Sequence, residues 1–154
     1  MEIKNKKGEV ILKAKGKGLT GAYLRGSDLE GADLRYAILR DADLTDDILR
    51  SADLRSADLR RADLRCADLE YANLEGVNLE GTNLEGADLE YTKNYYSFTA
   101  YDTSKRIVHC VKHDNQWMVK AGCFWGTLKE LEEKVKESHN SPVYLANIEI
   151  LKNL

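Results

Sequence analysis

The stretch SADLRSADLRRADLRCADLE, residues 51–70, repeats one five-residue unit four times. Leucine recurs at every fifth position from Leu19 to Leu89 without a miss. From residue 22 onward a small residue, usually Ala, stands two places before each leucine, and Asp or Asn usually lies between them. An α-helix winds a period of five around all its sides, and a flat strand sends alternate leucines to opposite faces. Neither element buries these leucines together.

A coil in which each unit forms one side of a square does bury them, because every unit then points its leucine and its small residue inward. Four units make one turn, and successive turns stack as parallel strands about 4.8 Å apart. The leucines fill so narrow an interior that close packing leaves room for little more than a methyl group beside them. We therefore predict a mainly β fold with a core of leucines, which includes Leu39, Leu44, Leu59, Leu64, Leu69 and Leu74.

The A(D/N)LXX pattern resembles the pentapeptide-repeat family over residues 17–92. The resemblance implies a right-handed quadrilateral β-helix, and we expect a small α+β C-terminal domain to follow it. Ile38 and Ile48 replace the usual Asp, and Asp47 takes the inward place of a small residue. Because an unpaired buried carboxylate is unfavourable by roughly several kcal/mol, we expect Asp47 either to bond to nearby backbone amides or to distort its unit.

Charge is unevenly distributed along the chain, whose formal net charge is -3. Arg dominates the outward position after Leu early in the repeat, whereas residues 66–92 hold seven acidic side chains and no basic one. Stacked like charges, such as Arg40 over Arg60, disfavour the coil by roughly a few tenths of a kcal/mol each.

Two interpretations of this charge pattern are open. Charge runs are usually solvated surface, whereas aromatic side chains beside charges are typical of protein interfaces. The second interpretation predicts an interaction surface made of Tyr71, Glu75, Glu80, Glu85, Glu90 and Tyr91.

Some pentapeptide-repeat proteins protect DNA gyrase by imitating duplex DNA. The resemblance therefore implies an alternative function, a DNA-mimic inhibitor or protector of a DNA-binding enzyme. About four turns give a coil of roughly 18 Å, which matches only about five base pairs. The eight arginines of the repeats also interrupt the negative field that a mimic needs. The sequence disfavours this alternative, and we expect no direct binding of nucleic acid.

The segments that flank the repeat are expected to cover its ends, where unpaired strand edges otherwise invite association. Residues 1–16 are predicted to form a hairpin cap that turns around Lys6, Lys7 and Gly8. Residues 93–154 are predicted to form a capping or interaction domain of the order ββαα, whose strands are 107–112 and 117–122.

The two predicted helices of this domain have clear start signals. Thr127 and Glu130 form a capping box at the first, and Ser141-Pro142 begins the second. An apolar stripe follows on the second helix, at Tyr144, Leu145, Ile148 and Leu151. We expect this domain to build a homodimer through the stripe.

The C-terminal motif GCFWG contains Cys123, Phe124, Trp125 and Gly126. It resembles the active-site segment of the peptide methionine sulfoxide reductases, in which Cys is the nucleophile and the aromatic residues hold the substrate methyl. Cys123 precedes a helix N-terminus, which lowers thiol pKa values, so a thiol enzyme is a second alternative. The resemblance spans only five residues, and Cys also packs as a small buried hydrophobe.

A longer resemblance is to pentapeptide-repeat proteins of bacteriophages and prophages. Their tail pattern, GCF-G-L-E…V…H…Y, is matched by Gly122, Cys123, Phe124, Gly126, Leu128, Glu130, Val135, His139 and Tyr144. This resemblance implies no enzymatic activity. We therefore predict a non-catalytic interaction module, encoded by a phage or prophage, that binds a host protein through its charged faces or its C-terminal domain.

Metal and cofactor sites are not predicted. His109, His113, Cys110 and Cys123 lack the spacing of a zinc site, and the many aspartates are explained by the repeat. The cysteines show no disulfide spacing, the N-terminus lacks the apolar segment of a secretory signal, and no apolar run approaches the roughly 20 residues of a membrane span. We expect a cytoplasmic protein without a membrane partner.

Overall fold

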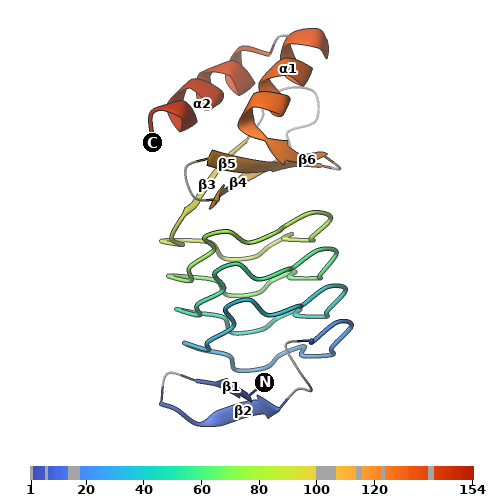
Figure 1. Ribbon diagram of the computed structural model, residues 1–154, viewed down its shortest axis with the longest axis vertical. Coiled ribbons are helices and arrows are strands. Elements are labelled where there is room, and N and C mark those ends of the chain that lie inside the picture. The colour runs from blue at the N-terminus through green and yellow to red at the C-terminus, as the bar shows by residue number, and fades with distance from the viewer. Residues whose placement is uncertain are drawn as a thin grey trace. The chain divides into compact units, whose positions relative to one another are not determined.

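The computed structural model describes the chain in several segments: residues 2–5, 7–13, 18–99, 107–113, 116–122, 124–138 and 141–154. The chain divides into two compact units, Met1–Asn94 and Tyr95–Leu154. The first unit is the N-terminal hairpin and the repeat, and the second is a small sheet with two helices (Figure 1).

The repeat forms a coil of stacked turns, residues 18–93, which we call the repeat coil (Figure 1). Parallel bridges join residues twenty positions apart, from Gly18 and Ile38 at one end to Asn73 and Lys93 at the other. Backbone N–H groups of one turn donate to carbonyls of the next, as Leu39 does to Asp58 at 2.8 Å. Because the bridges recur every five residues, each turn has four bridging sites.

Leucine side chains fill the repeat coil. The leucines from Leu29 to Leu79 are at most 1% exposed, and they include all six of the central leucines named above. Each contributes about 2 kcal/mol of apolar burial. Alanines occupy most of the remaining inward places, and where Thr82 replaces one, its hydroxyl donates to the Leu59 carbonyl at 2.8 Å. The period of five therefore produces one continuous apolar core.

The last residue of each unit turns the corner in the left-handed region of backbone space. Every corner from Gly21 to Tyr91 has a positive φ, and the non-glycine corners lie between 53° at Tyr91 and 60° at Tyr71. For a residue other than glycine, this conformation is unfavourable by roughly 1–2 kcal/mol. Nine of the fifteen corners nevertheless carry a side chain, so the coil holds these residues in place through its other contacts.

The N-terminal hairpin consists of β1 (Glu2–Lys4) and β2 (Val10–Lys13), which pair antiparallel. In the turn between them the Asn5 side chain accepts the backbone N–H groups of Lys7 and Glu9 at 3.0 Å each. Ile3 is fully buried. The Lys4 carbonyl accepts the N–H of Asp33 at 3.3 Å, so the hairpin is bonded to the first turn of the coil. Met1, Lys6 and residues 14–16 of the predicted cap lie outside the described residues.

The second unit contains four antiparallel strands in chain order. They are β3 (Tyr95–Thr99), β4 (Ile107–His113), β5 (Gln116–Ala121) and β6 (Phe124–Thr127). β4 and β5 form the hairpin expected at 107–122. The predicted order ββαα is wrong in its number of strands, because β3 and β6 extend this hairpin on both sides.

The missed strand β6 contains a glycine, which weakens a strand signal. A Cβ at Gly126 would lie 2.7 Å from Oε2 of Glu130 and 2.8 Å from Cζ of Phe124, so a larger residue would require these two side chains to shift. The other missed strand, β3, follows directly on the last repeat. Its pattern of two tyrosines, Ser97 and Phe98 is too short to stand out beside the repeat.

Two helices complete the second unit, α1 (Leu128–Ser138) and α2 (Pro142–Lys152). The capping box forms as expected, because Glu130 N–H donates to Oγ1 of Thr127 and Thr127 N–H donates to Oε2 of Glu130. The helices and the sheet share one buried cluster: Phe98, Val108, Cys110, Trp117, Val119, Leu131, Val135, Tyr144, Ile148 and Leu151. No helix in the described segments has both the length and the apolar character needed to cross a membrane.

Candidate protein-interaction surface

All eight arginines of the repeat coil are ion-paired with aspartates. A guanidinium bonded to a carboxylate lowers the carboxyl pKa, as Arg55 does for Asp53. Exposed pairs of this kind stabilise a fold by only about 0–1 kcal/mol each, but they neutralise the surface that carries them. The pairs are Arg25–Asp46, Arg35–Asp33, Arg40–Asp58, Arg50–Asp68, Arg55–Asp53, Arg60–Asp58, Arg61–Asp41 and Arg65–Asp63.

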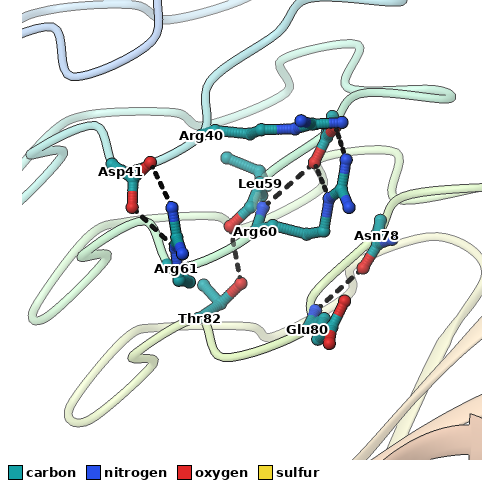
Figure 2. A network of polar contacts seen from close by, with 9 residues as sticks. Arg40, Asp41, Leu59, Arg60, Arg61, Asn78, Glu80 and Thr82 are labelled. Carbon is teal, nitrogen blue, oxygen red and sulfur yellow. Dashed lines mark hydrogen bonds and ion pairs between the residues drawn. The ribbon is translucent and has the colours of Figure 1, made fainter.

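The pairing offsets the repulsion expected between stacked arginines. Asp58 accepts from Arg60, two residues later in its own unit, and from Arg40, in the preceding turn. On the neighbouring corner Arg61 bonds Asp41 through two nitrogens, at 2.8 and 2.9 Å (Figure 2). Aspartates on neighbouring residues therefore offset the like charges of Arg40 and Arg60, which lie above one another in the stacked turns.

Unlike these paired arginines, four glutamates of the last turn have no ion-pair partner among the described residues. They are Glu75, Glu80, Glu85 and Glu90. We call these four residues the acidic turn. Arginines of the preceding turn attract three of them only over a longer distance. The unneutralised negative charge of the repeat coil is thus concentrated near its C-terminal end.

Asparagine replaces aspartate in three units of this part of the coil. The side-chain oxygen of Asn78 accepts the N–H of Glu80 at 2.9 Å (Figure 2), and Asn73 and Asn83 make the same bond two residues ahead at 3.1 Å. Aspartates make this bond in the arginine units, for example Asp58 to Arg60. Asparagine keeps the turn bond without placing a second negative charge beside the glutamate.

Tyr71 and Tyr91 stack on one corner of the coil. Their ring centroids are 5.1 Å apart and the rings are inclined by 10°. They are 47% and 68% exposed. Partial desolvation and the adjacent Glu70 carboxylate raise the pKa of Tyr71. A stacked, exposed tyrosine pair offers a rigid apolar surface of the kind that partners bury.

The six predicted interaction residues do not form one patch. Because the period of five places successive units on successive sides, the four glutamates of the acidic turn lie on four different sides. The tyrosine corner joins the side of Glu90 to the side of Glu75. We call Tyr71, Tyr91, Glu75 and Glu90 the corner patch. Glu80 and Glu85 lie on the other two sides.

One acidic cluster lies beside the corner patch. Ligand atoms of Asp68, Glu70 and Asp88 lie within 4.8 Å of one another. Arg50 pairs with Asp68 at 3.0 Å and also with Glu70. The chain's own arginine therefore already neutralises two of the three carboxylates.

The three described histidine and cysteine residues of the second unit, His109, Cys110 and His113, all lie on β4. The Tyr95 hydroxyl lies 2.7 Å from Nδ1 of His109. Burial lowers the pKa of His109 to about 4 and raises that of Cys110 to about 12. Neither group is charged near neutral pH. His113 packs edge-on to Trp125.

The C-terminal motif is only partly described. Cys123 and His139 lie outside the described residues, so the structure bears on neither the thiol nor the resemblance at these positions. Phe124 and Trp125 are half-buried in β6, and Phe124 packs against the core of the second unit.

The apolar stripe of α2 is not free. Tyr144, Ile148 and Leu151 belong to the buried cluster of the unit, and Leu145 packs against it. The homodimer expected from the sequence rested on this stripe. Within the described residues, the stripe is used to fold the unit itself.

The model for pentapeptide repeats matches residues 19–46, 49–81 and 62–93, in eight copies. A comparison with curated proteins found no match. Among solved structures, the chain is similar to HetL, a pentapeptide repeat protein involved in heterocyst differentiation regulation from the cyanobacterium Nostoc. The identity is 39% and the TM-score 0.38, over 50% of this chain and 38% of HetL.

Two further solved structures are similar over the same share of the chain. A pentapeptide repeat protein from the Arabidopsis thaliana thylakoid lumen is 27% identical, with a TM-score of 0.33, over 50% of this chain and 47% of that one. A second Nostoc pentapeptide repeat protein is 36% identical, with a TM-score of 0.30, over 50% and 71%. The chain spans less than half the length of HetL and of the Arabidopsis protein.

Proposed function

Because the chain belongs to the pentapeptide-repeat family through its repeat coil, we propose that it is a non-catalytic protein-binding module. The partner docks on the corner patch and carries positive charge where it meets Glu75 and Glu90. The observation that carries this proposal is the contrast between the paired arginines and the unpaired glutamates of the same coil. A coil built for stability alone gains nothing from leaving its last turn unneutralised.

We infer further that the coil is the right-handed quadrilateral β-helix of this family. Four bridging sites in each turn of twenty residues support this geometry. The second unit is inferred to cap the coil or to add a second binding surface. Its phage-type tail pattern supports a phage or prophage origin and a host protein as the partner.

The compartment proposed for the protein is the cytoplasm. Cys66 and Cys110, the two described cysteines, are both free thiols. Free thiols are usual in a reducing compartment.

The DNA-mimic alternative gains little support from the charge distribution. Pairing neutralises most of the charge of the arginine turns, and four unpaired glutamates are concentrated in about one turn. A mimic needs a regular negative field over several turns of duplex. We therefore propose a local acidic contact in place of a DNA-like surface.

The proposal is tested by reversing charge on two sides of the same turn. The variant Glu75→Lys with Glu90→Lys alters the corner patch, and Glu80→Lys with Glu85→Lys makes the same net change on the other two sides. Proteins captured from host extract by the wild-type chain are quantified for both variants. We expect the first variant to lose the partner at least tenfold more than the second, because contact charges act over a few ångströms in salt.

A captured partner must also bind the purified chain, and its affinity must fall as salt increases. Equal capture by the wild type and both variants would remove the corner patch as the site. Equal losses in both variants would indicate a long-range effect of net charge. Duplex DNA is added as a competitor. A partner that binds this chain in place of DNA is displaced by it, whereas other partners stay bound.

A further inference from the structure

Asp47 occupies a place in the core of the repeat coil that other units give to small residues. It is 0% exposed. In the column of residues twenty apart it lies between Ser27 in the preceding turn and Ala67 in the following one. Its neighbours Leu44 and Leu49 are buried leucines of the same turn. A carboxyl group here is surrounded largely by apolar side chains.

The hydrogen bonds of this carboxyl are incomplete. Oδ1 accepts the backbone N–H of Ser27 at 2.8 Å, which ties the second turn to the first. Oδ2 is buried and has no hydrogen-bond partner among the described residues. The Ser27 hydroxyl donates to the carbonyl of Leu24. An ionised carboxylate ordinarily accepts several hydrogen bonds, so this site suits the neutral acid better than the anion.

The nearest charges in the same turn are also negative. Asp43 and Asp46 both act against ionisation of Asp47. Arg25, in the preceding turn, pairs with Asp46 at 3.2 Å. Asp63 of the following turn opposes Asp43 and is itself paired with Arg65.

The following turn offers Asp47 no positive charge either. Asp68 donates its backbone N–H to the Asp47 carbonyl, and Arg50 holds the Asp68 carboxylate. Burial is the main cause that raises the pKa of Asp47 to about 7, and the N–H groups of Ser27 and Gly26 oppose it.

We propose that Asp47 makes the stacking of the first turn on the second depend on pH. The carboxyl is held neutral inside the coil, where its bond to the Ser27 N–H joins the two turns. Ionisation places an unpaired negative charge in the core and loosens this joint. The hairpin and the first turn then open more readily than the turns that follow.

The direction of the pH dependence follows from the two pKa values. The folded coil holds this proton more tightly than the unfolded chain, because the pKa is about 7 in the fold and 3.8 for the free side chain. The contribution of Asp47 to the stability of the coil is therefore greatest in acid. It falls as the pH rises from about 4 to about 7, and it is constant above pH 7. The difference corresponds to about a thousandfold change in the equilibrium constant for opening.

The experiment measures hydrogen exchange of the intact chain between pH 5 and pH 8.5, corrected for the intrinsic pH dependence of exchange. Three variants are compared with the wild type. Asp47→Asn keeps an oxygen that accepts the Ser27 N–H but cannot ionise, and Asp47→Ala restores the residue usual at this place. Asp33→Asn is the matched control, because Asp33 is an exposed, arginine-paired carboxylate of the first turn that is not among the charges acting on Asp47.

We expect residues 19–47 of the wild type to lose at least tenfold of their protection between pH 5 and pH 8.5. The Asp47→Asn and Asp47→Ala variants keep their protection, and Asp33→Asn follows the wild type. The same pH dependence in Asp47→Asn as in the wild type would overturn the proposal.

A direct titration covers the case in which an Asp47 variant does not fold. The 13C resonance of the Asp47 carboxyl is followed in the wild-type chain, and a midpoint between pH 6 and pH 8 supports the proposal. A midpoint below pH 5 would show that the carboxyl ionises freely in the folded coil and would overturn it.

Discussion

The left-handed corners of the repeat coil lead to an unusual prediction at Ser51. This residue is exposed and its φ is 58°. Its backbone N–H donates to the Glu70 carbonyl in the next turn at 2.8 Å. The residue therefore cannot relax to an ordinary φ without breaking a bond between turns. We predict that Ser51→Gly stabilises the coil and that Ser51→Val destabilises it.

The expected magnitudes follow from the conformation. Glycine removes the left-handed penalty of about 1–2 kcal/mol and gives back roughly 0.5–1 kcal/mol as backbone entropy. The net gain is on the order of 1 kcal/mol. Valine branches at Cβ and is a severe outlier at this φ. Because strained conformations of this kind are unfavourable by about 1–3 kcal/mol, we expect valine to lose about 1–2 kcal/mol relative to serine.

Hydrogen exchange of the amides in residues 38–70 reports this effect separately from the second unit. A change of about 1 kcal/mol alters their protection about fivefold. Thr20→Val is the control, since Thr20 is an exposed residue of the same coil whose φ is not positive. Wild-type or higher protection in Ser51→Val, or a clear loss in Ser51→Gly, would refute the assignment of strain to the corners.

Three further predictions concern the core, a close contact and a buried histidine. Leu64→Ala should lower the unfolding free energy of the coil by about 2–5 kcal/mol, measured by hydrogen exchange. Leu89 is only half-buried, so a smaller loss for Leu64→Ala than for Leu89→Ala would contradict the core assignment. Gly126→Ala should destabilise the second unit by about 0.5–2 kcal/mol, because its Cβ would lie 2.7 Å from Oε2 of Glu130 and would displace this side chain from its capping bonds to Thr127. An unchanged urea midpoint of tryptophan fluorescence would count against this contact. Burial lowers the pKa of His109 from 6.5 to about 4, so the folded unit resists protonation and should lose up to about 3 kcal/mol as the pH falls through that range. The urea midpoint of the second unit is measured against pH in the wild type and in His109→Gln. If the midpoint of the variant falls in acid as much as that of the wild type, another group is responsible.

The repeat coil was accessible to sequence reasoning because one residue type repeats at one spacing. Fifteen leucines at one spacing, most of them with a small residue two places before, leave few other ways to bury an apolar face. The corner conformation was not accessible. Arg61, Cys66 and Tyr71 have no intrinsic preference for a positive φ, and only the closure of the coil imposes it on them.

Site prediction met a similar limit. In a coil with twenty residues to a turn, Tyr71 and Tyr91 lie above one another, and their rings do stack. The same comparison of residues twenty apart considers only the outward positions after each leucine. It therefore missed that Asp58, at a bridging position, pairs with both Arg40 and Arg60. An Asp two residues before an Arg was the signal that was available in the sequence.

A coil with bridges at every fifth residue can gain or lose a whole unit without exposing its core. Deleting five residues leaves every later leucine pointing inward but rotates the later surface by a quarter turn relative to the earlier one. A deletion before Tyr71 would carry both tyrosines to a new side together, whereas a deletion between Tyr71 and Tyr91 would separate them. Such changes offer this chain a way to alter its recognition surface in discrete steps while its scaffold stays intact.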